Sequence, residues 1–154
     1  MSSIIQKYIE ACVFVFQDDH PRYLLLRRSG DERVYPGVWQ FITGSIEGEE
    51  RAVEAAVREL KEETNLVPRA MWIVPYVNSF YDQGRDAISL NPVFAFEVEK
   101  GADPMISAEH EQFQWLKFEE ALDLLVWPGQ REALRIVHEF LIKGKDAMTH
   151  SRIH

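Results

Sequence analysis

Seven glutamates lie within 23 residues, "GSIEGEERAVEAAVRELKEETNL", from Gly44 to Leu66. On a helix, Glu59, Glu62 and Glu63 would fall within an arc of about 100°. Carboxylates at such short separations raise one another's pKa and destabilise the helix when they are charged. A hard divalent cation with oxygen ligands, Mg²⁺ or Mn²⁺, would turn this repulsion into a binding site. The alternative is a solvated acidic face on which Arg58 and Lys61 pair with the acids.

The same stretch contains the pattern of the helix that must hold these acids. Apolar residues recur at helical spacing at Ala52, Val53, Ala56, Val57 and Leu60. They predict a helix from about Glu50 to Thr64 with one buried face, and the acids lie to one side of it. Asn65 tolerates the left-handed backbone that ends many helices, and Pro68 prevents the helix from continuing.

The spacing of these residues resembles the signature of the Nudix hydrolases, G-x5-E-x7-R-E-U-x-E-E-x-G-U, where U is a bulky aliphatic residue. The corresponding residues are Gly44, Glu50, Arg58, Glu59, Leu60, Glu62, Glu63, Asn65 and Leu66. Eight of the nine match. Asn65 replaces a glycine, and we expect the turn to survive because asparagine tolerates the same backbone. The resemblance implies an α/β/α sandwich and hydrolysis of a nucleoside diphosphate linked to another group, by attack of water on phosphorus. In such sites bridging metals polarise phosphoryl oxygens and help to generate hydroxide.

The resemblance also implies roles for individual residues. Glu59 and Glu63 are expected to bind the metal, and Glu62 is a further ligand or the general base. Arg58 is expected to orient these glutamates and to pair with Glu50. The loop acids Glu47 and Glu49 are expected to be solvated.

A further acid is expected from outside this stretch. The sequence "SAEHEQFQWL" supplies Glu109 just before a predicted strand. Relatives place an extra metal ligand or base there, and the alternative is a loop acid in water. His110 could accept a proton near neutral pH, but a lone loop histidine is more often at the surface.

The rest of the chain predicts a mixed sheet with helices on both faces, an α/β (α+β) class. Runs of β-branched and aromatic residues predict six or seven strands, and apolar periodicity predicts three helices. The predicted strands are 9–17, 23–28, 38–43, 71–81, 87–98 and 113–118, and the two later helices are 118–125 and 130–142. We expect one domain over residues 1–154, with a tail that frays from about Gly144.

The pattern "WQ-x-x-TGS-x-E" before the acidic helix is similar to the dihydroneopterin triphosphate pyrophosphatase branch, also described as dATP pyrophosphohydrolase. That resemblance implies release of pyrophosphate from a triphosphate. Arginine binds phosphate with a planar fork, so Arg27, Arg28 and Arg85 are candidate phosphate contacts. Gly44 is a further candidate substrate-binding residue. Arg27 neighbours Arg28, and alternation along a strand keeps the two from both facing the ligand.

Aromatic residues could stack on a purine or pterin ring, namely Trp39, Phe80 and Tyr81, although core packing is the commoner fate. Tyr81 also favours an alternative substrate, a dinucleoside polyphosphate. A second alternative is a Nudix-fold module that senses a nucleotide without cutting it. Such modules usually lose the glutamates of the signature, and this chain keeps Glu59, Glu62 and Glu63. A protein-interaction scaffold has no specific feature in its favour.

Composition limits the partners. A formal net charge of −8 argues against nucleic acid or an anionic membrane surface as the main partner. This negative charge would also repel a phosphate ligand, and a bound divalent cation would offset the repulsion. Cys12 is the single cysteine, so no disulfide forms within the chain, which is expected of a protein in the reducing cytoplasm. Its apolar neighbours predict that its side chain is buried in the core. No signal peptide is visible. A homodimer is possible, but no residue predicts its interface.

Overall fold

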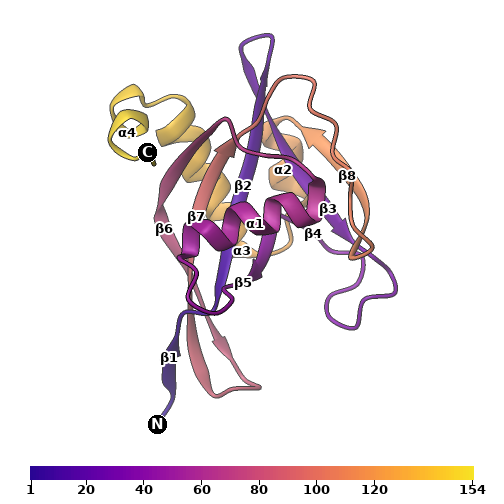
Figure 1. Ribbon diagram of the computed structural model, residues 1–154, viewed down its shortest axis with the longest axis vertical. Coiled ribbons are helices and arrows are strands. Elements are labelled where there is room, and N and C mark those ends of the chain that lie inside the picture. Colours follow the sequence, from indigo (N-terminus) through magenta and orange to yellow (C-terminus); the bar gives the residue numbers. More distant parts are fainter.

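The computed structural model describes residues 1–154 and contains one eight-stranded sheet with helices on both faces (Figure 1). The strands are β1 (Ser3–Ile5), β2 (Tyr8–Gln17), β3 (His20–Arg28), β4 (Trp39–Gln40), β5 (Ile42–Ser45), β6 (Ala70–Asp82), β7 (Ala87–Glu97) and β8 (His110–Leu116). The helices are α1 (Ala52–Thr64), α2 (Phe118–Leu124), α3 (Pro128–Ile136), the π-helix η1 (Val137–Ile142) and α4 (Lys145–His150).

The sheet is mixed, as the sequence predicts. β7 runs parallel to β1 and to β2, whereas the other pairs are antiparallel. The order β1–β7–β2–β3–β4 forms the main path, while β5, β6 and β8 pair with β2, β7 and β3 respectively. β6 and β8 therefore lie at opposite edges of the sheet (Figure 1). None of the helices combines the length and the hydrophobicity that spanning a lipid bilayer requires.

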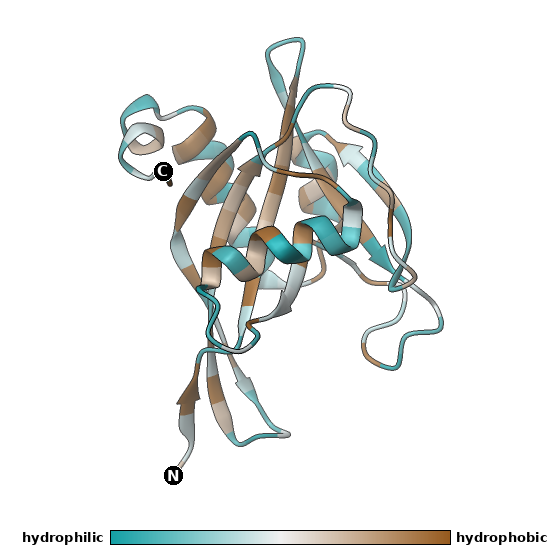
Figure 2. Ribbon diagram, viewed as in Figure 1, coloured by the Kyte–Doolittle hydropathy of each residue, from teal (hydrophilic) through white to brown (hydrophobic).

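Alternation along the strands divides the interior into two cores. On β3, Leu24 and Leu26 pack with Leu60 of α1 on one face, and Tyr23 and Leu25 belong to the cluster on the other face. Figure 2 shows hydrophilic residues along the outward side of α1 and hydrophobic residues along the strands behind it.

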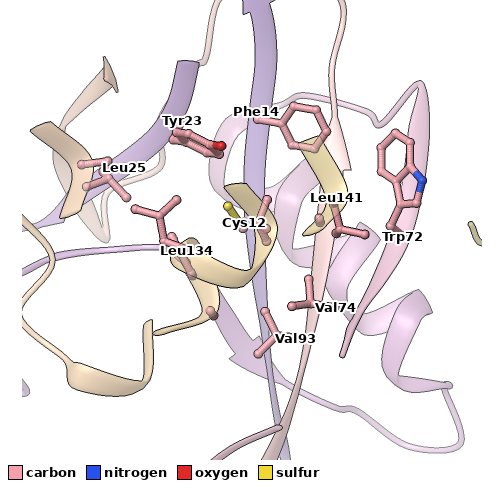
Figure 3. Packing of buried hydrophobic residues seen from close by; sticks show 14 of the residues in the cluster. Cys12, Phe14, Tyr23, Leu25, Trp72, Val74, Val93, Leu134 and Leu141 are labelled. Carbon is pink, nitrogen blue, oxygen red and sulfur yellow. The ribbon is translucent and has the colours of Figure 1, made fainter. Parts of the chain in front are cut away.

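The second core lies beneath the C-terminal helices. Figure 3 shows side chains of β2, β3, β6 and β7 packed around Leu134 of α3 and Leu141 of η1. Cys12 is fully buried in this cluster, as predicted, and burial raises the pKa of its thiol. The two cores fix the sheet between α1 and the C-terminal helices.

The segment predicted as one strand, Val38–Thr43, is divided. Trp39 pairs with Arg27 of β3, but Ile42 pairs with Ala11 of β2, so the chain changes partner between β4 and β5. At the break, the Phe41 N–H donates to Gln130 Oε1 at 3.3 Å. Three further features were not predicted: strand β1, the start of α3 at Pro128, and the change from α to π geometry at Val137.

The prediction that the tail frays from Gly144 is wrong. Helix α4 forms there, and the chain then returns to the outer edge of β6. The Ile73 N–H donates to Ser151 O at 2.9 Å, and the Ile153 N–H donates to Met71 O at 2.9 Å. The guanidinium of Arg152 lies 5.3 Å from the centre of the Trp72 ring, which is a cation–π contact.

Candidate active site

Helix α1 holds the acidic residues, and its two ends are fixed by local contacts. At the start, the Arg51 N–H donates to the Glu54 carboxylate at 2.7 Å, which satisfies a backbone donor that the helix leaves unpaired. At the end, Asn65 has φ 61° and ψ 13°, and its N–H donates to Lys61 O. The left-handed turn expected at this position is confirmed.

We expect Asn65→Gly to be nearly neutral for activity, because the Asn65 side chain is exposed and its hydrogen bond goes to Met105 Sδ, at 3.8 Å, and not to a residue of the acidic cluster. Asn65→Ala is the matched variant, and it should cost about 1 kcal/mol of unfolding free energy because alanine lacks asparagine's tolerance of positive φ. Urea unfolding and steady-state rates check both variants. A large rate change in Asn65→Gly would mean that the asparagine side chain acts in the site.

Arg58 is the centre of an ion-pair network on α1. Its guanidinium contacts Glu50 at 2.7 Å, Glu59 at 2.9 Å and Glu62 at 3.2 Å. It also donates to Ser45 O at 2.7 Å, which ties the helix to β5. The hydrogen bond from Arg58 lowers the pKa of Glu50. These contacts hold the acids on fixed sides of the Arg58 guanidinium.

Gly44 has a role that the sequence did not predict. A Cβ at this position would lie 2.1 Å from Glu59 Cδ and 2.3 Å from Glu59 Oε1. The Glu59 carboxylate therefore packs directly against the Gly44 backbone. A side chain at residue 44 would displace this acid, so Gly44 positions Glu59.

The glutamates of α1 meet the segment before β8 in one cavity of about 240 Å³. Its lining residues are Glu59, Glu62, Glu63, Ser107, Ala108 and Glu109. The Ser107 N–H donates to Glu63 O at 3.2 Å, and the Ser29 N–H donates to Glu109 O at 2.9 Å. These backbone bonds hold the segment against the end of α1 and beside β3. Glu109 is thus brought to the three glutamates of the helix.

The acids in this cavity differ in environment. Glu62 is 58% exposed, whereas Glu63 is 4% exposed and its Oε2 has no hydrogen-bond partner in the protein. Burial, then the charges of Glu59 and Glu109, raises the pKa of Glu63 to about 9. Burial also raises the pKa of Glu59, against the opposing effect of Arg58. Burying a charged carboxylate costs free energy unless a cation or hydrogen-bond donor pairs with it. The cluster of Glu59, Glu63 and Glu109 is therefore suited to bind a divalent cation.

The prediction that His110 lies at the surface is wrong. It is 4% exposed, and one ring nitrogen, one Glu63 oxygen and one Glu109 oxygen all lie within 4.8 Å of one another. Burial, and then the charge of Arg28, lowers the pKa of His110 to about 4.

Alternation from Phe113 and Trp115, which pack on the α1 face, would place His110 on the other face. A register shift in the β3–β8 ladder between Arg27 and Arg28 instead pairs His110 with Arg28, and no sequence signal marks this shift. Ser107 was also missed, and no sequence signal marks it.

The two arginines of β3 point apart, as alternation requires. Arg28 Nε donates to Val34 O at 2.8 Å, and its charge lowers the pKa of the nearby Glu63 carboxyl against the larger effect of burial. Arg27 instead donates to Gly37 O at 3.2 Å and pairs with Glu111 at 3.4 Å. Arg28 is therefore the arginine on the side of the acids.

Other predicted substrate contacts are not brought to the cavity. Arg85 lies in the β6–β7 turn, where it pairs with Asp82 at 2.7 Å and covers the Tyr8 ring. This turn and the strand β8 are on opposite edges of the sheet. Trp39 packs against the core beneath α3, on the face opposite α1. Tyr81 is exposed and donates to Asp86 at 2.9 Å.

Comparison with known proteins decides the family. The model of the NUDIX domain matches residues 7–137. The chain belongs to the NUDIX family. It is a hydrolase that acts on phosphoric anhydride bonds, and the fold and the spacing of its signature agree with this assignment.

Curated relatives are similar over different shares of their length. The nucleoside triphosphatase NudI of Klebsiella pneumoniae is 28% identical over 116 residues, 71% of this chain and 81% of that protein. The dihydroneopterin triphosphate diphosphatase of Escherichia coli is 36% identical over 63 residues, 41% of this chain and 39% of that protein. An octanoyltransferase of Myxococcus xanthus is 36% identical over 124 residues, 74% of this chain, but the match spans only 31% of that longer protein.

Solved structures share the NUDIX fold. A Listeria monocytogenes protein assigned to the NUDIX hydrolases has a TM-score of 0.75 and 25% identity, covering 90% of this chain and 95% of that one. A Caenorhabditis elegans Ap4A hydrolase has a TM-score of 0.73 and 20% identity, covering 91% of this chain and 99% of that one. At that identity the second likeness concerns the fold alone.

Proposed function

We propose that this NUDIX protein is a metal-dependent pyrophosphohydrolase that cleaves a nucleoside-triphosphate-like substrate, dihydroneopterin triphosphate or dATP, to a monophosphate and pyrophosphate. The observation that carries the proposal is the convergence of Glu59, Glu63 and Glu109 on one cavity, with a buried Glu63 oxygen that no protein group satisfies. This is the donor set that Mg²⁺ or Mn²⁺ prefers.

The residues have separate roles in this proposal. Glu59, Glu63 and Glu109 hold the cation, which when bound neutralises phosphoryl charge and activates water. Glu62 is the most exposed of the three helix acids that line the cavity, so it is free to accept a proton from water as the general base, and Glu109 is the second candidate for that role. Arg58 keeps the helix acids apart, and Arg28 supplies a positive charge beside them for a phosphate.

Support for the substrate comes from the relatives and from charge. Two curated relatives are named for triphosphate substrates, the nucleoside triphosphatase and the diphosphatase, and the diphosphatase is similar in a segment of 63 residues. A net charge of −8 favours a small anionic substrate whose charge a cation neutralises over nucleic acid or a membrane. The octanoyltransferase match covers a third of that protein, so acyl transfer is not part of the proposal.

Product analysis with Mg²⁺ tests the proposal across dihydroneopterin triphosphate, dATP, other nucleoside triphosphates, diadenosine polyphosphates and ADP-ribose. Pyrophosphate and a monophosphate, formed fastest from the pterin or dATP, would support it. Fastest cleavage of a diadenosine polyphosphate would overturn the proposed substrate and make the protein a dinucleoside polyphosphate hydrolase. Tight binding with no turnover of any compound would make the protein a nucleotide sensor.

We expect Glu109→Ala to lower the rate about 10²-fold at saturating metal, near the low end of what a positioned base contributes. Its backbone bond from Ser29 would remain, so the loop should keep its place. Glu111→Ala is the matched control, because Glu111 belongs to the same segment but pairs with Arg27 at 3.4 Å. Initial rates at several metal concentrations check the pair. Equal rates in both variants would make Glu109 a bystander.

A further inference from the structure

We propose that His110 is a direct ligand of the cation in this site, so that one imidazole nitrogen joins the carboxylates and shifts metal preference from Mg²⁺ towards Mn²⁺ and Co²⁺. This inference rests on the metal dependence proposed above. It adds a nitrogen donor to a site that the signature describes with glutamates alone.

The imidazole of His110 has unmet hydrogen-bonding capacity. His110 is 4% exposed, yet neither Nδ1 nor Nε2 has a partner in the protein. Buried polar groups are almost always paired, and leaving one unpaired costs free energy. The Arg28 guanidinium, opposite His110 in the β3–β8 ladder, is engaged by Val34 O and Glu32. A cation bound by one nitrogen would compensate for the burial of the ring.

The position of the His110 ring also favours coordination. One nitrogen of His110 and one carboxylate oxygen each of Glu63 and Glu109 lie within 4.8 Å of one another. Octahedral bonds of about 2.1 Å place ligand atoms roughly 3.0 to 4.2 Å apart, so a shift of less than about 1 Å would bring the three onto one ion. Glu63 Oε2 is also buried without a partner, so two unsatisfied groups from different elements meet at the same place.

The structural setting keeps the ring in that place. His110 is the first residue of β8, and its N–H donates to Ser107 O at 3.1 Å. The Ser107 N–H in turn donates to Glu63 O, which links the His110 backbone to the end of α1. A ligand on a strand that is tied to the helix carrying the other ligand is pre-organised, which lowers the cost of assembling the site.

A nitrogen donor has a consequence for metal choice. Mg²⁺ strongly prefers oxygen ligands and keeps several waters. Imidazole binds first-row transition ions, with affinity rising from Mn²⁺ to Co²⁺ and Ni²⁺. The chain should therefore bind Mn²⁺ and Co²⁺ more tightly than an all-carboxylate site of the same charge would, while its affinity for Mg²⁺ depends mainly on the glutamates.

Electron paramagnetic resonance with Mn²⁺ tests the ligand directly and without turnover. The loss of the free Mn²⁺ signal on titration measures binding, and pulsed measurements of the bound ion detect ¹⁴N coupling from a coordinated imidazole. We expect this coupling in the wild type and in the control His20→Gln, whose histidine is exposed in β3, and we expect its loss in His110→Gln. His110→Gln should weaken Mn²⁺ binding by at least about tenfold, as changes around metal ligands do, and Mg²⁺ binding much less.

The outcomes separate the inference from the proposed function. Bound Mn²⁺ without ¹⁴N coupling in the wild type would overturn the role of His110 and leave the metal-dependent hydrolase standing. Failure of Mn²⁺ and Mg²⁺ to bind would overturn both. The absence of coupling in the wild type overturns the inference whatever the fold of His110→Gln, and coupling that persists in His110→Gln would assign the nitrogen to another of the five histidines and overturn it too.

Discussion

Replacing Glu63 by glutamine should abolish turnover while the metal-free protein keeps its fold. The glutamine keeps the shape of a side chain that is 4% exposed but removes a charge that burial, Glu59 and Glu109 all disfavour. The variant also loses an anionic metal oxygen. Stabilisation of phosphoryl charge by a metal is worth several kcal/mol, so a loss of about 4 kcal/mol corresponds to a rate roughly 10³-fold lower.

The same substitution should change the pH dependence of stability. The pKa of Glu63 is about 9 in the folded protein against an ordinary value of 4.5, so the folded state holds a proton that the unfolded state releases. The contribution of Glu63 is fully present below pH 4.5 and is lost as the pH rises to about 9. In the presence of a chelator, the free energy of unfolding of the wild type should therefore fall over that range, and Glu63→Gln should remove this component.

Urea unfolding at several pH values, with and without Mg²⁺, checks these expectations. Metal should raise the midpoint of the wild type and not that of Glu63→Gln, because only the former binds the ion tightly. Glu54→Gln is the control on the same helix, since the Glu54 carboxylate accepts the Arg51 N–H and does not line the cavity. Wild-type turnover in Glu63→Gln would remove Glu63 from the metal site.

The second large effect is expected from Gly44→Ala. The added Cβ would lie 2.1 Å from Glu59 Cδ, so the Glu59 carboxylate must move away from β5. Gly44 does not have a left-handed φ, so the contact with Glu59, and not backbone strain, requires glycine here. Misplacement of a catalytic group by about 1 Å can cost on the order of 10²-fold in rate, and we expect a loss of that size.

Gly30→Ala is the matched control, because its Cβ would meet nothing closer than Glu111 Oε2 at 4.0 Å and its φ is also ordinary. Steady-state rates and metal titrations of the two variants check the prediction. Gly44→Ala should bind the metal less tightly and stay folded. An unchanged rate would show that the Glu59 carboxylate can relocate without loss of function.

Sequence reasoning was sufficient where one local period determines the structure. The helix α1 was predicted within two residues at its start, because the apolar residues and the acids share one helical repeat. Features that depend on distant partners were not predictable. The break between β4 and β5 is stabilised by Gln130, which is 89 positions from Phe41. Strand β1 is three residues long and exists through its pairing with β7.

The same distinction applies to the site. Spacing alone places Glu59, Glu62 and Glu63 on one side of a helix, but their different burial comes from the segment before β8 that covers Glu63 and leaves Glu62 exposed. That segment also buries His110, which sequence reasoning placed at the surface. Arg85 has a suitable chemical character for phosphate, yet the topology carries it to the opposite edge of the sheet. The residue types indicated the chemistry of the site, and the chain topology determined which of those residues lie in it.

The return of the tail to β6 has a consequence for association between molecules. β6 pairs with β7 on one side only, so its other side would present unpaired backbone donors and acceptors. The Ile73 and Ile153 N–H bonds and the Arg152–Trp72 contact occupy part of that side. Exposed strand edges can pair with strands of other molecules. By covering part of this edge, residues 144–154 hinder such pairing. Shortening the chain after Lys143 should leave the acidic site in place and make the protein prone to form β-linked oligomers as its concentration rises.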